Sequence, residues 1–590
     1  MNRKIQLLSI LFLGFSQFAF AQIKEEKLIL NKKREPEVKK IEKKKTSVET
    51  IKNYPPEEKS QNPVKYTITD VPAVSDFKTS TIQGQDVTPK FEGTAQNNYV
   101  QFGMGNFGKI LADANISKTL DNKLEVGADF HFLSTLGLKK EYAWDSKQSS
   151  TAIGAYLNSY GEKGKFNLNA QYGLDNNRYY GIYALEPAAD VDLKQKVNQF
   201  KVNGYYDFYS NEILNDVRVK SSFLKDHFDA QENQVSILAN LSKHAVEIGK
   251  SGINLNADLG VGIEAVKTEF AIRDKNSSNF FNTTLDPKVT FRKGDSYLML
   301  GSTFSFLNAK NSNDLLGGEV KNNKTYWFPQ AEFQFAAAKE FKFYGGVDGG
   351  LKLNTYGDLL QANPFIVSDQ FLRPTETQYH FYAGLRGDID ETFKYDVSAG
   401  YGKMRNIMFF QGNNLFDDTY TLNRSAYNFA NTFSAVYDDG NVSDIKGSLQ
   451  YFPLENLILD AEVKFTKYDL KNYKDIYNVP LLNASIGAKY TMLDKKLLLG
   501  FKGIFASDRT TNSFAIEGVA NPGGMAYQST EDRNDKVGGY ADLNLSAEYK
   551  FHKNFSVFAI GNNLLNSNYQ TYKGYKVLGA QILGGVKITF

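Results

Sequence analysis

The chain has 590 residues, a formal net charge of +3 and no cysteine. These values exclude disulfides, thiolate metal sites and an acylated N-terminal cysteine, and they give no indication of a nucleic-acid partner. The 35 Tyr and 44 Phe, with only 14 Pro, are typical of β-rich proteins. A mean hydropathy of -0.42 and the lack of a late apolar run of ~20 residues exclude a helical membrane protein. A membrane β-barrel remains open, because only every second residue of its strands must be apolar.

Residues 1–21 have the pattern of a secretory signal peptide. Arg3 and Lys4 precede a mostly apolar stretch, and Ala19-Phe20-Ala21 has small residues at the spacing that signal peptidase reads. The alternative is a retained anchor, but the apolar stretch is short for a membrane span. We therefore expect cleavage before Gln22 and export from the cytoplasm.

Two further segments precede the main domain. Residues 22–61 are rich in Lys and Glu and lack apolar periodicity, so they cannot bury enough apolar surface to order themselves. We interpret them as a disordered periplasmic arm. Residues 62–96 are less charged and contain Pro63, Pro72 and Pro89, which disfavour a helix. We expect this extended segment to enter the lumen of the domain that follows.

Residues 97–590 repeat one pattern, in which apolar and mostly polar residues alternate over long stretches. Such a stretch runs from Leu457 to Thr466, and others run from Leu124 to Phe132 and from Ala541 to Phe551. Strands of soluble sandwiches average about 5 or 6 residues. These stretches instead have the roughly 9 to 11 residues that a tilted strand needs to cross a bilayer, which predicts membrane-spanning strands.

The connections between these strands alternate in length. Ten are short turns, such as Glu162-Lys163-Gly164 and His552-Lys553-Asn554. The other connections are mostly long and polar, at 135–150, 174–195, 272–282, 307–323, 355–375, 405–430 and 507–535. This asymmetry is typical of outer-membrane barrels with periplasmic turns and extracellular loops. With a first strand from Tyr99 to Met104 and a last from Tyr575 to Phe590, we predict an all-β transmembrane antiparallel barrel of about 22 strands.

The chain ends in a strand pattern, with Val586, Ile588 and Phe590 on one face and Lys587 and Thr589 on the other. A closed barrel pairs its last strand with its first and leaves no edge. We interpret Val586, Ile588 and Phe590 as the signal recognised by the barrel-assembly machinery. Phe590 is then expected in the periplasmic aromatic girdle, in contact with outer-membrane lipid.

Three motifs carry a family resemblance: "GNNLLNSNYQTY" from Gly561, "YDDGN" from Tyr437 and "NASIGAKY" from Asn483. Together with the strand count, they resemble the barrel of Bacteroidetes-type TonB-dependent receptors over residues 97–590. The resemblance implies a barrel in the outer membrane of a Gram-negative bacterium. Such receptors carry an N-terminal plug of well over a hundred residues, whereas residues 22–96 contain neither a TonB box nor a glycine-rich plug core. This departure puts a TonB partner in doubt.

No motif predicts an enzyme, and we expect no catalytic residue, cofactor or metal. "GMGNFGK" from Gly103 matches a dinucleotide fingerprint, but an alternating strand follows it, which favours a hairpin. The five histidines lack metal-ligand spacing. Asp417-Asp418 and Asp438-Asp439 are either Ca²⁺ ligands or, as we favour, solvated loop acids. Six aromatic residues in long loops are candidate contacts for a sugar or a partner protein, or for a lid over the barrel: Trp144, Tyr179, Tyr180, Phe409, Phe410 and Phe416.

The sequence leaves two function classes open. In the first, a plugless barrel is a subunit of an outer-membrane transport, secretion or protein-assembly complex with protein partners. Its lumen is then filled by residues 62–96, by infolded loops or by a partner. In the second, the chain is a stand-alone nutrient transporter or a passive channel. An open 22-stranded lumen is a wide aqueous hole, which favours an occluded state.

Overall fold

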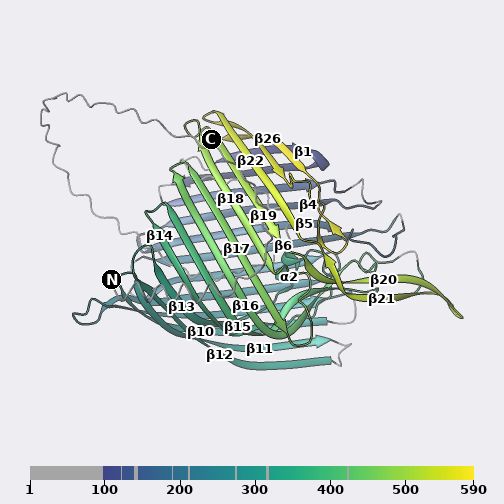
Figure 1. Ribbon diagram of the computed structural model, residues 1–590, viewed down its shortest axis with the longest axis horizontal. Helices are drawn as coiled ribbons and strands as arrows, with labels where there is room; N and C mark the ends of the chain where they lie inside the picture. The colour runs from purple at the N-terminus through teal and green to yellow at the C-terminus, as the bar shows by residue number, and fades with distance from the viewer. Residues whose placement is uncertain are drawn as a thin grey trace, which may run out of the picture. The chain divides into compact units, whose positions relative to one another are not determined.

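The computed structural model describes residues 98–590, apart from 121–122, 139–141, 143, 189, 210–212, 273–275, 314–317 and 422–423. The predicted signal peptide, arm and extended segment at 62–96 lie outside the described residues. Within the described part, 22 strands form one antiparallel sheet that closes on itself (Figure 1). No helix among these residues has the length and hydropathy of a membrane-spanning helix. The predicted barrel of about 22 strands is confirmed.

The strands of the barrel are β1 (Tyr99–Gly105), β2 (Ile110–Leu120), β3 (Leu124–Thr135), β4 (Gln148–Tyr160), β5 (Gly164–Arg178), β6 (Lys194–Phe208), β7 (Leu214–Asp226), β8 (Gln231–Glu247), β9 (Asn254–Phe270), β10 (Asn276–Lys293), β11 (Ser296–Asn313), β12 (Gly318–Ala336), β13 (Lys342–Lys352), β14 (Thr375–Ile389), β15 (Phe393–Gly412), β16 (Phe433–Leu454), β17 (Leu457–Leu470), β18 (Leu482–Met492), β19 (Leu497–Ala506), β22 (Tyr540–His552), β23 (Phe555–Asn562) and β26 (Gln581–Thr589). The smaller elements are η2 (Asn106–Gly108), α2 (Tyr356–Ala362), a hairpin of β20 (Arg509–Asn521) and β21 (Gly524–Val537), and a short hairpin of β24 (Gln570–Tyr572) and β25 (Tyr575–Lys576). "GMGNFGK" forms the connection from β1 to β2, so the expected hairpin is confirmed.

The barrel closes between its first and last strands. Residues 99–105 of β1 pair with residues 583–589 of β26, and the Phe590 amide donates to the Asn98 carbonyl at 3.1 Å. The predicted last strand, from Tyr575 to Phe590, begins too early, because β26 starts at Gln581. Tyr575 pairs with Tyr572 in the β24–β25 hairpin instead. The Gly574 backbone, at φ +85°, forms the turn of this hairpin, so the chain reverses there before it enters the barrel wall.

The alternation in the sequence separates the two faces of the wall. In β22, Asp542, Asn544 and Glu548 are buried on the inner face, whereas Leu545 and Tyr549 are exposed on the outer face. At the seam, Val586 and Ile588 are exposed beside Phe102 and Val100 of β1. Phe590 follows with half of its surface exposed, on the same outer face. The outer face therefore carries an apolar band, as a wall in contact with lipid requires.

The two ends of the barrel differ in their connections. The turn end carries Asn98, Phe590 and the short turns, from two residues at 294–295 to six at 248–253. The loop end, opposite to it, carries the long connections 179–193, 353–374, 413–432 and 563–580, together with the β20–β21 hairpin, which projects there (Figure 1).

Two of the predicted long loops are wrong. Residues 272–282 and 307–323 belong mostly to β10, β11 and β12, which continue to the loop end and are joined through 271–275 and 314–317. The polar residues of these stretches reflect the polar surroundings of the side chains and do not indicate that the strand has ended. The backbone still satisfies its hydrogen bonds by pairing with the neighbouring strand.

The C-terminal strand leads to a testable prediction. We expect Phe590→Asp to reduce insertion of the barrel strongly, because the change places a charge on the apolar face of the strand that closes the sheet. The measurement is the heat-modifiable fraction on a semi-native gel of outer membranes. Phe551→Asp is the matched control, since Phe551 is equally an exposed aromatic residue at the turn end but lies in β22. An assembly signal at Phe590 requires the terminal variant to be much the poorer of the two; equal insertion of both would contradict it.

Candidate functional site: loops packed into the barrel mouth

The connection between β13 and β14 folds into the barrel at the loop end. Its residues 353–374, here called the inner loop, contain helix α2, which Figure 1 shows within the ring of strands. The inner loop is hydrogen-bonded to β7, β8, β10, β11 and β16, so its contacts are spread around the wall. It therefore crosses the lumen rather than lying along one side of it.

The start of α2 is held by a buried carboxylate. Glu232 of β8 accepts hydrogen bonds from the Tyr356 amide at 2.6 Å and the Gly357 amide at 2.9 Å. Its third partner is the Thr268 hydroxyl of β9, at 2.8 Å. A carboxylate suits this place, because the first amides of a helix have no partner within the helix. A Cβ at Gly357 would lie 3.2 Å from Glu232 Oε1, so the missing side chain lets the backbone approach closely.

A second buried carboxylate ties the same turn of helix to β7. Asp226 accepts from the Tyr356 hydroxyl at 2.7 Å and from Gln195 Nε2 at 3.2 Å, while Ser368 Oγ lies 2.8 Å from the same Nε2. Burial raises the pKa of the Tyr356 hydroxyl well above its ordinary value, so the hydroxyl keeps its proton and donates to Asp226. This network joins the two halves of the inner loop to the wall.

The second half of the inner loop is held by backbone pairing. The Val367 amide donates to the Phe433 carbonyl at 3.0 Å, and the Phe433 amide donates to the Phe365 carbonyl at 3.2 Å. The side chain of Gln370 extends this pairing, because its Oε1 accepts from the Ala435 amide at 2.7 Å. Asn276 of β10 donates to the Gln370 carbonyl at 3.0 Å from another part of the wall. These hydrogen bonds satisfy backbone groups of the crossing segment and fix it to β10 and β16.

Apolar side chains fill the space around the inner loop. The buried cluster joins Tyr356, Leu359, Phe365, Ile366 and Leu372 of the inner loop to inward residues of the strands and of other loops. The strands contribute Val197, Leu224, Val266, Phe280, Leu307, Phe328 and Ala435, and the other loops contribute Tyr179, Tyr180, Phe429, Tyr572 and Tyr575. This cluster is a hydrophobic core inside the barrel, and it stabilises the loops in one arrangement.

Aromatic rings connect the loops to one another. The Phe365 and Tyr575 rings stack with centroids 3.6 Å apart, and the Tyr575 ring packs edge-on against Tyr180 at 4.9 Å. The Tyr179 hydroxyl donates to the Ile366 carbonyl at 2.8 Å, and the Tyr575 hydroxyl donates to the Asn431 carbonyl at 2.6 Å. These contacts link four long loops, and Leu138 adds the β3–β4 connection, so five long loops share one core with the inner loop at its centre.

The structure brings four of the six candidate aromatic residues together in this region. Tyr179, Tyr180 and Phe410 are buried members of the core, and Trp144 packs against it, with its Nε1 donating to the Tyr180 carbonyl at 2.8 Å. Phe409 is buried in a separate cluster against Tyr473 and Tyr477. The predicted loop position of Phe409 and Phe410 is wrong, because both lie in β15 and pair with β16. Phe416 lies against Tyr427, with the ring centroids 5.8 Å apart. In this arrangement the four aromatic side chains of the core contact other parts of the same chain, as expected if the loops form a lid over the barrel.

Sequence reasoning missed the residues that hold the inner loop, namely Glu232, Asp226 and Gln195. It also treated 355–375 as an ordinary polar loop. A signal was present, because "LNTYGDLLQANPFIVSDQFL" from Leu353 contains large apolar residues that a solvated loop does not need. Glu232 and Asp226 are harder to identify from the sequence, because each resembles an ordinary polar residue at the end of an alternating strand.

Among the described residues, the acidic pairs Asp417-Asp418 and Asp438-Asp439 do not form a metal site. Within the part of the chain that the structure describes, no group of three His, Cys, Asp or Glu side chains is placed to hold a metal ion. Asp438 accepts from the Asn472 amide at 2.7 Å and the Tyr473 amide at 3.0 Å, so it anchors the start of the 471–481 connection.

Comparisons with known proteins identify the fold. No family model and no curated protein matches the sequence. Among solved structures, the siderophore receptor PiuA from Acinetobacter baumannii matches with a TM-score of 0.60 and 11% identity, over 85% of this chain and 82% of that chain. The FrpB iron transporter from Neisseria meningitidis matches with 0.59 and 10%, over 84% and 83%. The copper transporter OprC matches with 0.57 and 12%, over 85% and 81%. The chain thus has the fold of these receptors and transporters.

Proposed function

We propose that this chain is a receptor-like β-barrel of the Gram-negative outer membrane, of the Bacteroidetes type, that works as a subunit of a transport, secretion or protein-assembly complex. One observation carries the proposal: the inner loop crosses the barrel and shares a hydrophobic core with four other long loops. Loops packed into a barrel in this way argue against an open diffusion channel. Opening it requires a partner or ligand that binds the open arrangement better than the closed one.

The loops themselves favour a protein partner over a small ligand as the opener. The aromatic side chains that a small ligand would stack on are engaged in the core, where Tyr179, Tyr356 and Tyr575 have no exposed surface. A small molecule that displaced them would have to compensate for the loss of the whole core. A protein that takes over several loops gains interface area in exchange.

The test is purification of tagged full-length protein from outer membranes extracted with a mild detergent. We expect a stoichiometric partner protein, identified by mass spectrometry, that remains bound through size-exclusion chromatography. An untagged strain is the control for adventitious capture. A monodisperse barrel with no partner, extracted under two different detergents, would overturn the subunit proposal.

The second candidate is a stand-alone nutrient transporter or channel. It is favoured by the structural neighbours, whose descriptions name a siderophore receptor and iron and copper transporters. In that case the protein purifies alone, and its deletion slows growth on one nutrient. The two candidates therefore differ in what the same strain shows.

The proposal also fixes the orientation of the barrel. We expect an epitope inserted next to Gly524, at the tip of the β20–β21 hairpin, to be labelled by antibody on intact cells. An epitope in the Asp494-Lys495 turn should be labelled only after the outer membrane is permeabilised. The reason is that Gly524 lies at the loop end and the turn lies at the opposite end. Labelling of the turn but not of the hairpin on intact cells would reverse the orientation.

A further inference from the structure

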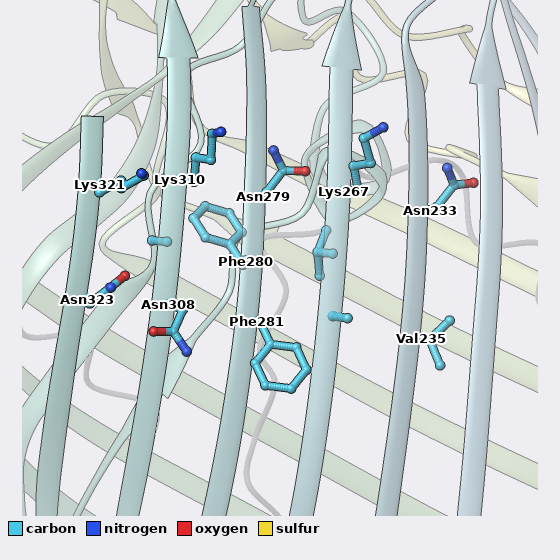
Figure 2. Close-up of a pocket in the computed structure, with 13 residues that line it drawn as sticks. Asn233, Val235, Lys267, Asn279, Phe280, Phe281, Asn308, Lys310, Lys321 and Asn323 are labelled. Carbon is cyan, nitrogen blue, oxygen red and sulfur yellow. The ribbon is translucent and has the colours of Figure 1, made fainter. Parts of the chain in front are cut away.

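The outer face of the barrel has an ordered set of side-chain rows where β8 to β12 approach the loop end. Paired residues of an antiparallel sheet point to the same side, so the register defines each row. One row, here called the lysine row, is Asn233, Lys267, Asn279, Lys310 and Lys321. The row next to it, on the side of the turn end, is Val235, Ala265, Phe281, Asn308 and Asn323. Figure 2 shows these two levels one above the other.

Apolar residues continue from these rows toward the middle of the barrel. Phe281, Phe306 and Trp327 are exposed on the outer face, with 45%, 41% and 61% of their surface accessible. Successive rows are about 7 Å apart, because a strand rises about 3.4 Å per residue. The outer face thus changes from aromatic and aliphatic residues to asparagine and then to lysine within about two rows. This order of side chains is expected where the barrel wall emerges from the hydrocarbon layer of a bilayer.

The lysine row carries more positive charge than its carboxylate partners neutralise. Lys267 Nζ lies 2.8 Å from Glu269 Oε1, while Lys310 and Lys321 share Glu319 at 2.6 and 3.2 Å. Three ammonium groups therefore face two carboxylates. Each lysine side chain keeps at least half of its surface exposed, so these ion pairs are solvated and contribute little to stability.

The lysine row also lines a hollow. A cavity of about 620 Å³ lies along these strands and is lined by Lys267, Lys310, Lys321 and the asparagines beside them (Figure 2). The two glutamates stand in the next row toward the loop tips, so they are on the far side of the lysines from the apolar band. An anion that approaches from the apolar side meets ammonium and amide donors first.

We propose that the lysine row binds the phosphate groups of a phosphorylated lipid in the outer leaflet. The acyl chains of such a lipid lie along Phe281, Phe306 and Trp327, which places its head group one to three rows higher, at the lysines. The apolar rows below belong to the continuous band of the wall, and this favours a lipid over a protein as the occupant. The inference rests on the outer-membrane orientation proposed above, but not on the subunit role.

The test uses the full-length purified barrel and native mass spectrometry in detergent. The titrated probes are lipid A with its phosphates, dephosphorylated lipid A and inorganic phosphate. The variant is Lys267→Gln/Lys310→Gln/Lys321→Gln. The control, Lys163→Gln/Lys250→Gln/Lys495→Gln, removes the same charge from exposed turn-end positions. We expect the lysine-row variant to bind phosphorylated lipid A at least about fivefold more weakly, and the control to bind it as the wild type does.

Each other outcome overturns the inference. Equal binding of phosphorylated and dephosphorylated lipid A would mean that the acyl chains alone are recognised. Equal binding by variant and wild type would mean that the lysines are not the contact. If the variant keeps its lipid but loses a protein that co-purifies with the wild type, the face is a protein interface. Heat modifiability must be unchanged in both variants, and the presence or absence of a partner in the pull-down tests the subunit role separately.

Discussion

Replacing the inner loop by a short linker should turn a closed barrel into a wide pore. The design is favourable, because Lys352 at the end of β13 pairs directly with Thr375 at the start of β14. A linker of about four Gly and Ser residues can therefore join the strands as an ordinary hairpin turn. Without residues 353–374 the core loses its central member, and direct contacts between the other loops, such as that of Asn431 Nδ2 with the Tyr179 carbonyl, lose the packing of the inner loop. We expect large, stable conductance steps in planar bilayers where the wild type gives none.

The same variant has a consequence in cells. Cells that carry it should become sensitive to large antibiotics that the outer membrane normally excludes, since the ring of 22 strands encloses a wide aqueous lumen. The matched variant lacks Asn62 to Gln96 and keeps the inner loop. If the loops are the seal, the matched variant conducts like the wild type. If only the matched variant conducts, the N-terminal segment is the seal; if both stay closed, another part of the chain or a partner closes the lumen.

The barrel was predictable because its strands follow a local rule. Residues alternate over Leu124 to Phe132 and over Ala541 to Phe551 because one face of each strand has apolar surroundings and the other has polar surroundings. Each turn is likewise recognisable from the residue types of a few neighbouring positions. Counting the ten short turns, each of which joins two strands, and adding the first and last strands is enough to predict the number of strands. Closure between β1 and β26 needs only that the first and last strands of residues 97–590 belong to the wall, and the pattern from Gly584 to Phe590 indicates this for the last strand.

The long strands show where that rule fails. β10 to β12 extend well past the apolar band, and their residues at the loop end include asparagine, serine and lysine, such as Asn279, Ser312 and Lys321. Beyond the bilayer the outer face of these strands carries polar residues, while the inner face packs on the inner loop through both apolar and polar residues, such as Phe280 and Ser278. Apolar and polar residues therefore no longer alternate regularly, although the pairing continues. A polar stretch of strand then resembles a loop in the sequence. Side-chain patterning alone therefore does not define where backbone pairing ends.

The packed loops were not predictable for a different reason. The contacts that hold α2 join residues far apart in the chain: Glu232 and Tyr356 are separated by 124 positions, and Tyr179 and Ile366 by 187. No period in the sequence relates such partners. The apolar content of the inner loop shows that it is buried somewhere, but the wall that receives it is set by the closure of the barrel.

Glu232→Ala should loosen the inner loop without opening the barrel wall. The change removes the acceptor for the Tyr356 amide, the Gly357 amide and the Thr268 hydroxyl, and all three groups remain in a buried region. An unsatisfied buried donor costs about 1 to 3 kcal/mol, and hydrogen bonds to a charged group lie at the upper end of the range. We therefore expect the closed arrangement to lose on the order of 3 kcal/mol relative to the open one. Hydrogen exchange of the amides in 353–374 should accelerate by on the order of 100-fold.

The control for this variant is Glu125→Ala on β3. Glu125 also accepts a hydrogen bond from an inward neighbour, Asn158, at 3.0 Å, but it lies at the turn end of the wall. Both variants should keep the heat-modifiable barrel, because the strand ladder does not depend on either side chain. Only Glu232→Ala should show faster exchange in the inner loop and brief openings in bilayers. If exchange there is unchanged, the hydrophobic core alone holds the loop; if the barrel itself unfolds, Glu232 supports the wall and is no latch. A selective effect would mean that a partner able to compete for the amides of Tyr356 and Gly357 has a direct route to opening the barrel.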